Sequence, residues 1–294
     1  MRKASSLVLA AAVAGSLAAP SVASAAPTVE RDAANCAVYR NPDGPQADLY
    51  ALTVDGRLVS VNRQVPVLLR ESKVVTGVQG TIVGMDVRPA NGLLYAVSNS
   101  GGTGRIYTLN PSTGAATFAS QISVVLAGTA FGVDFNPVPD RLRVVTDTGQ
   151  NLRINVDTGA ATVDGALAYS GGGDPDVTGA AYTNSVPPSP RTADPNVPST
   201  GTTLYDIDSA ADTLVIQNPP NNGTLNTVGP LGFDVTSVNG FDIDGDAGNL
   251  AYAAIALANV RPSLLARIDL ATGRAQVRGV IGCAETVVAL AFKA

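Results

Sequence analysis

The sequence has no histidine and no tryptophan, and its 294 residues include only two cysteines. Without histidine, the chain cannot form a Ser-His-Asp or Cys-His catalytic centre or bind zinc or iron through imidazole. Two cysteines are too few for a cysteine-only zinc site. The Gly-Lys-Ser/Thr ending of a phosphate-binding loop is also missing, so the sequence does not indicate an NTPase.

Charged and aromatic side chains are scarce. Charged residues make up 15% of the chain, and the aromatic residues are 8 tyrosines and 6 phenylalanines. Beyond Lys3 the only lysines are Lys73 and Lys293. An acidic, lysine-poor surface argues against nucleic acid or anionic membranes as partners. The shortage of aromatic faces argues against binding of sugar rings or unpaired bases.

The N-terminus has the pattern of a secretory signal. Arg2 and Lys3 precede an uncharged apolar stretch over 7–19, and Ala23-Ser24-Ala25 offers a cleavage site of small residues. We expect residues 1–25 to be a signal peptide for the general secretory route, which places the mature chain in the periplasm or outside the cell. Its removal changes the formal net charge from −5 to −7. No later run reaches the roughly 20 apolar residues of a membrane span.

A degenerate repeat runs through the rest of the chain. Its units share a short apolar pattern in which a glycine or alanine is followed two residues later by aspartate or alanine. The five segments are Val83–Pro89, Phe131–Pro137, Thr178–Asn184, Asn239–Gly245 and Val288–Ala294. The second residues of these segments are 48, 47, 61 and 49 positions apart, and the long interval contains a Pro-, Ser- and Thr-rich insertion over 185–201.

The repeat predicts an all-β, five-bladed β-propeller. Three further strand-like runs with glycine turns follow the shared pattern, and four strands in about 48 residues match one blade. The run 48–54 reads as a second strand and 287–292 as a first strand, so the two ends should pair and close the ring. We expect an N-terminal extension over 26–46 and a single domain over 47–294. Six blades or stacked β-sandwiches are the alternatives.

The two cysteines, Cys36 and Cys283, lie near opposite ends of the expected mature chain. An even pair in an exported protein favours a disulfide. We expect this bond to fasten the closure of the ring.

The order and spacing of these elements resemble the bacterial exported propeller-like family called domain of unknown function 4394. The similar features are Leu-Tyr-Ala-Leu-Thr at 49–53, the Gly-x-Asp-x-Arg/Asn-Pro elements at 84–89 and 132–137, and Asn-Pro-x-Thr-Gly at 110–114. The resemblance implies a propeller and export, and it implies no activity.

Three aspartates, Asp86, Asp134 and Asp242, occupy equivalent positions in the expected innermost strands. Around a ring they would lie near the axis, where they could bind a cation or supply an acid and a base to a glycosidic bond. A structural role, in which each carboxylate accepts backbone N–H groups of a neighbouring blade, is the simpler interpretation. Ala181 and Ala291 take the other two positions, so any site would be asymmetric.

A second acidic pattern overlaps the first. Asp242, Asp244, Asp246 and Asn249 alternate near glycines, as the oxygen ligands of a calcium loop do. The match to an EF-hand is partial, and an acidic turn between strands is the alternative. Calcium is therefore the one candidate cofactor.

The sequence favours a non-enzymatic, monomeric scaffold that binds a protein or a small ligand. The alternative is a lactonase-like or glycosidase-like hydrolase that depends on calcium or carboxylates in the central channel. The insertion over 185–201 is a further candidate for binding.

Overall fold

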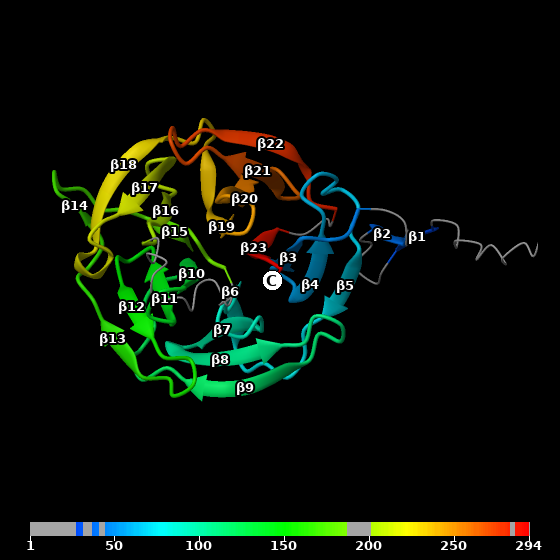
Figure 1. The fold of residues 1–294 in the computed structure, drawn as a ribbon, viewed down its shortest axis with the longest axis horizontal. Helices are drawn as coiled ribbons and strands as arrows, with labels where there is room; N and C mark the ends of the chain where they lie inside the picture. The colour runs from blue at the N-terminus through cyan, green and yellow to red at the C-terminus, as the bar shows by residue number, and fades with distance from the viewer. Residues whose placement is uncertain (1–27, 32–36, 41–44, 187–200, 283–285, 294) are drawn as a thin grey trace, which may run out of the picture.

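The computed structural model describes residues 28–31, 37–40, 45–186, 201–282 and 286–293. Five sheets, antiparallel except for one added strand, stand around a common axis and form a ring (Figure 1). This arrangement confirms the predicted five-bladed β-propeller, and neither the six-bladed ring nor the stacked sandwiches is formed.

Each blade runs from an inner strand at the axis to an outer strand at the rim. Blade 1 consists of β23 (Val287–Phe292), β3 (Leu49–Thr53), β4 (Arg57–Val61) and β5 (Glu71–Val74). Blade 2 consists of β6 (Thr81–Val87), β7 (Leu94–Ser100), β8 (Thr103–Leu109) and β9 (Ala116–Gln121). Blade 3 consists of β10 (Phe131–Asn136), β11 (Arg141–Thr146), β12 (Asn151–Ile154) and β13 (Ala161–Val163).

The last two blades complete the ring. Blade 4 consists of β15 (Val177–Tyr182), β16 (Leu204–Asp208), β17 (Thr213–Gln217), β18 (Thr224–Pro230) and an added fifth strand, β14 (Ala168–Tyr169), which pairs in parallel with β18. Blade 5 consists of β19 (Val235–Asp244), β20 (Leu250–Leu257), β21 (Leu264–Ile268) and β22 (Ala275–Val280). A short 3₁₀ helix, η1 (Pro220–Asn222), joins β17 to β18.

The two ends of the propeller share one blade. The C-terminal strand β23 pairs antiparallel with β3, with Leu290 opposite Ala51. This pairing was predicted from the sequence, and it removes the exposed edges that an open arc would leave at the axis.

Apolar side chains fill the layers between blades because strand residues alternate between the two faces of each sheet. Phe135 and Leu142 of blade 3 pack with Tyr95 and Val97 of blade 2 in one layer. Similar layers lie between the other blades. These layers hold the inner strands in fixed positions around the axis.

Glycine corners close the outer hairpins of the blades. At Asn110–Gly114 the Gly114 N–H bonds to the Asn110 carbonyl at 2.8 Å, and Gly114 has a φ of 79°. A positive φ strains residues that carry a Cβ, so glycine fits this Thr-Gly turn.

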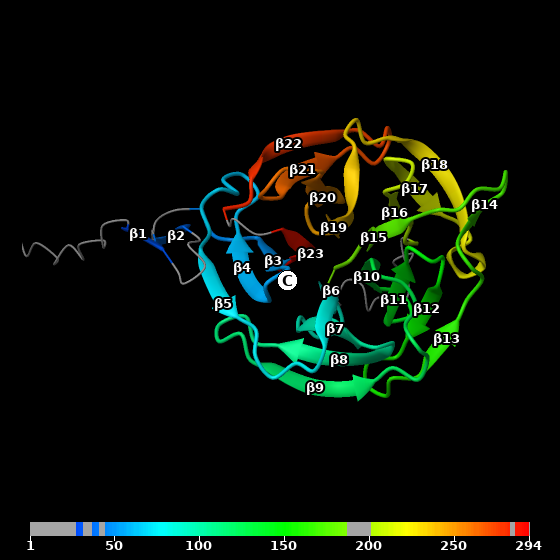
Figure 2. The same ribbon diagram turned by 180° about the vertical axis from the view of Figure 1, so that it is seen from behind.

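A small hairpin of β1 (Thr28–Arg31) and β2 (Ala37–Arg40) extends outside the ring in both views (Figures 1 and 2). The expected signal peptide (1–25), both cysteines, Cys36 and Cys283, and most of the insertion (187–200) lie outside the described residues. In the part of the chain that the structure describes, no helix is long and apolar enough to cross a membrane.

Candidate functional site: the carboxylates at the propeller axis

The inner strands approach one another closely because glycines face the next blade. A Cβ on Gly132 would lie 2.7 Å from the Ala180 amide nitrogen of blade 4. A Cβ on Gly240 would lie 2.6 Å from the Leu290 amide nitrogen of blade 1. These two glycines therefore bring backbones of neighbouring blades together, and Gly84 leaves room for the Val133 side chain of the next blade. The aspartate two residues after each glycine lies on the same face.

Each axial aspartate bonds to the backbone of the next blade. Asp86 Oδ2 accepts the Phe135 amide at 2.8 Å, and Asp134 Oδ2 accepts the Tyr182 amide at 2.7 Å. The third of these bonds joins the Phe292 amide of blade 1 to Asp242 Oδ2 of blade 5, at 2.6 Å. The motif thus supplies an interblade acceptor, as the structural interpretation of the sequence predicted.

The amides of Val87 and Ile243 have no aspartate in the preceding blade to accept them. Ala291 of blade 1 stands in that position for Val87, and Ala181 of blade 4 stands there for Ile243. The amide of Val87 bonds instead to Asp86 Oδ1, and the amide of Ile243 bonds to Asp242 Oδ1, each at 2.6 Å. Three carboxyl groups therefore satisfy five equivalent amides, one in each blade. Buried backbone groups need such partners.

The sixth carboxyl oxygen, Asp134 Oδ1, accepts none of these five amides. The approach of the Asp86 and Asp134 carboxyl groups acts to lower the pKa of Asp86 and to raise the pKa of Asp134. Ionised carboxylates only accept hydrogen bonds, so a bond between these two groups would need a proton, and the directions of the two effects favour Asp134 as its carrier.

Burial dominates the acidity of this trio, because all three residues are at least 95% inaccessible to solvent. Burial, and then the charge of Asp242, raise the pKa of Asp86 well above its usual value. Burial, and then the charges of Asp86 and Asp242, do the same for the pKa of Asp134. Burial raises the pKa of Asp242 to about 6, against the effect of its two amide bonds.

The same trio could hold a cation. One oxygen from each of Asp86, Asp134 and Asp242 lies within 4.8 Å of the other two. Carboxylate oxygens are the hard ligands that calcium prefers, although calcium usually takes six to eight of them. A cation here would also need to fit beside the backbone bonds that these oxygens already accept.

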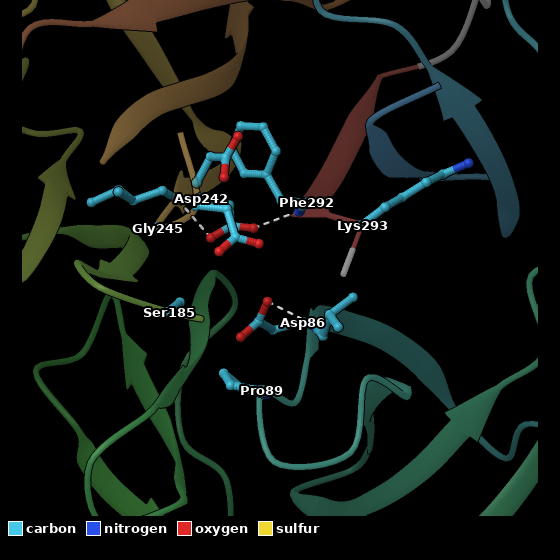
Figure 3. Close-up of a pocket in the computed structure, with 11 residues that line it drawn as sticks. Asp86, Pro89, Ser185, Asp242, Gly245, Phe292 and Lys293 are labelled. Carbon is cyan, nitrogen blue, oxygen red and sulfur yellow. Dashed lines mark hydrogen bonds between the residues drawn. The ribbon is translucent and has the colours of Figure 1, made fainter. Parts of the chain in front are cut away.

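A small cavity opens on Asp86 and Asp242 from one face of the ring (Figure 3). It is lined by Asp86, Asp242, Asp244, Asp246 and Ser185, among others, and its volume is about 30 Å³. Such a volume accommodates a water molecule or a single ion. Drug-sized ligand sites occupy roughly 300–1,000 Å³, so the channel has no room for a sugar ring at the carboxylates.

The opposite end of the axis is narrower. The space there is about 10 Å³, between inner-strand residues such as Met85 and Phe131. Access to the carboxylates therefore comes from the end that carries Asp244 and Asp246, which we call the acidic mouth, together with Ser185 and Lys293 at its rim.

Of the four candidate calcium ligands, Asp242, Asp244 and Asp246 line the cavity at the acidic mouth, and Asn249 does not. Asp242 lies at the axis, and Asp246 is exposed at the acidic mouth. Asp244 pairs with Arg63 at 2.6 Å. Asn249 exchanges hydrogen bonds with Asn184, at 2.7 Å with its backbone and 3.0 Å with its side chain.

Several charged residues around the acidic mouth were missed by the sequence analysis. Arg63 pairs with both Asp48 and Asp244. The Lys293 side chain points away from the carboxylates and lies over the Tyr50 ring, with 4.6 Å from Nζ to the centroid (Figure 3). The place of Lys293 beside the axis could have been predicted, because it directly follows the innermost strand, which ends at Phe292.

A family model described as "Domain of unknown function (DUF4394)" matches residues 57–291. No curated protein matches the chain.

Solved structures with similar folds are distant. A structural genomics protein of unknown function from Bacteroides thetaiotaomicron has 17% identity and a TM-score of 0.49 over 81% of this chain and 59% of its own. TolB from Acinetobacter baumannii has 11% identity and a TM-score of 0.46 over 80% and 53%. A protein from Lactobacillus plantarum has 12% identity and a TM-score of 0.41 over 89% and 92%. The chain thus spans about three-fifths of the first of these, and similarities this weak assign it no function.

Proposed function

Because the chain belongs to the DUF4394 family, whose description names no activity, we propose from the site itself that the protein is an exported, non-enzymatic propeller that binds a partner at its acidic mouth. The observation that carries this proposal is the engagement of all three axial carboxyl groups by the backbone of the ring. Groups that join the blades are poorly placed to act as a general acid, base or nucleophile, because any movement would break the ring contacts.

The size of the channel supports the same proposal. A cavity of about 30 Å³ at the carboxylates is about a tenth of a small-molecule site. A partner would therefore contact the rim of the acidic mouth, where Asp246 is exposed. The carboxylates there favour a cationic group on the partner.

The test reverses one exposed charge at the rim. Partners captured by the mature protein from its own extracellular or envelope fraction would be purified and titrated against variants. We expect Asp246→Lys to weaken binding at least tenfold. The matched control is Asp174→Lys, which makes the same charge change at an exposed residue outside the mouth and should bind as the wild type does. Equal affinities of both variants would reject the mouth as the binding surface.

Calcium binding in the channel, with a hydrolytic role, is the second candidate. The observation in its favour is the approach of three carboxyl oxygens to within 4.8 Å of one another. A bound ion stabilises the folded state by about 2.7 kcal/mol at a hundredfold excess over its dissociation constant. Melting curves with calcium, with magnesium and with a chelator test this. A calcium-specific rise that disappears in Asp134→Asn would favour it, and identical curves would reject it.

Export also belongs to this proposal. We expect the mature chain to begin at Ala26, after the small residues Ala23-Ser24-Ala25. N-terminal sequencing of the protein recovered outside the cytoplasm would test this, and an intact Met1 would contradict it.

A further inference from the structure

A second buried carboxyl group lies away from the axis, in the layer between blades 3 and 4. Asp206, in the middle of β16, is completely buried. Neither of its oxygens has a hydrogen-bond partner among the described residues. An ionised carboxylate in this state would be very costly, so the site must supply a neutralising species.

The repeat places an apolar residue at this position in every other blade. Asp206 lies opposite Ala180 of its inner strand. The residues that occupy the same place in the other four blades are Ala51, Ala96, Val144 and Ala253. Asp206 therefore faces an aliphatic layer, which includes Ala180 and Val215.

Gln217 is a complementary group that the register places on the same face of the sheet. Asp206 pairs with Val215 across the sheet, and Gln217 follows Val215 by two residues on the same face. Such diagonal neighbours lie within side-chain reach. Gln217 Nε2 donates to the Pro220 carbonyl, whereas the fully buried Oε1 has no partner in the described part of the chain.

The charged groups around Asp206 are already paired. From β11, the buried Arg143 guanidinium bonds to other groups, and no ion pair joins it to Asp206 in the described structure. Its partners are the Tyr182 hydroxyl of β15, Asn151, Asp164 and Asn221. Asp164 is also held by Arg153 of β12. On β16 itself Asp208 accepts the Tyr169 hydroxyl of β14 at 2.6 Å, and β17 contributes no charged residue to this face.

We infer that Asp206 is held as the neutral acid and donates its proton to Gln217 Oε1, which is a proton-dependent contact within blade 4, between β16 and β17. One proton pairs Gln217 Oε1 with one Asp206 oxygen and removes the charge of Asp206, without any added ion. A metal cation fits less well, because the positive Arg143 shares this layer and only three oxygens are available.

The acidity of Asp206 agrees with this assignment. Burial raises its pKa to about 8, and the charge of Arg143 opposes the shift. An unfolded chain ionises aspartate near about pH 3.9. Between these two values the folded state retains a proton that the unfolded state has lost, so this residue lowers stability as the pH rises from about 4 to about 8.

Asp206→Asn tests the inference, because asparagine can donate to Gln217 Oε1 at every pH. We expect the variant to melt several degrees above the wild type near pH 8 and at the same temperature near pH 4. The matched control is Asp208→Asn, two residues along the same strand and equally buried. Its carboxylate is already paired, so this variant should melt below the wild type near pH 8.

Infrared spectroscopy gives a second readout on the folded proteins. The wild type near pH 7 should show a protonated carboxyl band that is missing from the Asp206→Asn spectrum. An unchanged difference spectrum, or an Asp206→Asn protein that melts below the wild type near pH 8, would overturn the inference, because Asp206 would then be ionised and held by water or a cation.

Discussion

At the scale of single residues, the axial aspartates are explained by five amides that need acceptors. Asp242 accepts two of them, from Ile243 and Phe292. Each buried N–H group left without a partner costs about 1–3 kcal/mol.

Asp242→Ala should therefore lower the free energy of unfolding by about 2–5 kcal/mol, because both amides lose their acceptor. Urea unfolding followed by circular dichroism measures the change. The control is Asp246→Ala, an exposed neighbour whose loss should stay within about 0.5 kcal/mol. If Asp242→Ala were as stable as this control, the axial carboxylates would not be joining the blades.

The Asp206 site shows where reading single residues from the sequence fails. The sequence predicted the alternation of the strands, and that alternation implies an apolar residue at this position. Two residues in adjacent blades depart from the repeat. Asp206 replaces an apolar residue in blade 4, and Arg143 of blade 3 occupies the position where the other four blades carry tyrosine. Only the packing of β11 against β15 shows that the two departures share one layer.

At the scale of elements, the close approach of inner strands depends on glycine. A Cβ at position 132 would come within 2.8 Å of the backbone of blade 4. Gly132→Ala should therefore cost about 1–3 kcal/mol of stability through overpacking. Gly171→Ala is the matched control, because a Cβ there would meet nothing within 4 Å; it should change little. Thermal melting of both variants measures the difference, and equal melting temperatures would contradict this account of the motif.

The pairing of β23 with β3 closes the ring. Deleting 287–294 removes the inner strand of blade 1, which packs Leu290 into the layer with blade 5, and should abolish cooperative unfolding. Deleting only Lys293 and Ala294 removes a single described backbone bond, from the Lys293 amide to Asp48, and should leave a folded protein. A cooperative melt of the longer deletion would show that the ring does not need its closing strand.

The elements that could be predicted are those that the repeat carries. The spacing of the shared pattern predicted five blades, and the incomplete ends predicted their pairing. The strand β14 was not predicted, because a two-residue parallel pairing with β18 depends on contacts distant in sequence. The hydrogen bond between the Asn184 and Asn249 side chains was also not predicted, because the two residues are far apart in sequence and the pattern around Asn249 indicated a calcium loop.

At the scale of the whole molecule, the balance of perturbed carboxyl groups sets the pH of greatest stability. The pKa values of Asp86, Asp134, Asp206 and Asp242 are raised, chiefly by burial. Their contribution to the free energy of unfolding is complete below the pKa of aspartate in the unfolded chain, about 3.9. It is lost as the pH rises through their pKa values in the folded protein. Burial raises the pKa of Asp164, but hydrogen bonds from Arg153 and Arg143 together outweigh it and lower the value, and a hydrogen bond from Arg88 lowers the pKa of Asp157. The contribution of these two residues to stability is therefore lost as the pH falls below about 3.9.

The protein should therefore be most stable in mildly acidic solution, between about pH 4 and 6. Urea midpoints measured across the pH range test this. A midpoint that rises steadily from about pH 5 to about pH 8 would contradict the raised pKa values of the buried carboxyl groups.

The closure of the ring also bears on the disulfide, which remains a prediction because Cys36 and Cys283 lie outside the described residues. Their described neighbours meet at one segment: Val38 pairs with Leu69, and the Gly282 amide bonds to the Pro66 carbonyl at 3.1 Å. Closing a loop of about 250 residues would stabilise the fold by about 5.5 kcal/mol in the chain-entropy model. Mass analysis of a non-reducing digest should find the Cys36–Cys283 peptide pair, and two free thiols would reject it.

The central claim is that the axial carboxyl groups hold the blades together. Amide hydrogen exchange in Asp134→Ala tests it most directly, because this variant removes the acceptor of the Tyr182 amide alone. The account predicts that the Tyr182 amide exchanges faster than the overall loss of stability of the variant explains. The amides of Phe135 and Phe292 are held by Asp86 and Asp242, and they should lose only the protection that this overall loss of stability explains. Unchanged protection at Tyr182 would contradict it.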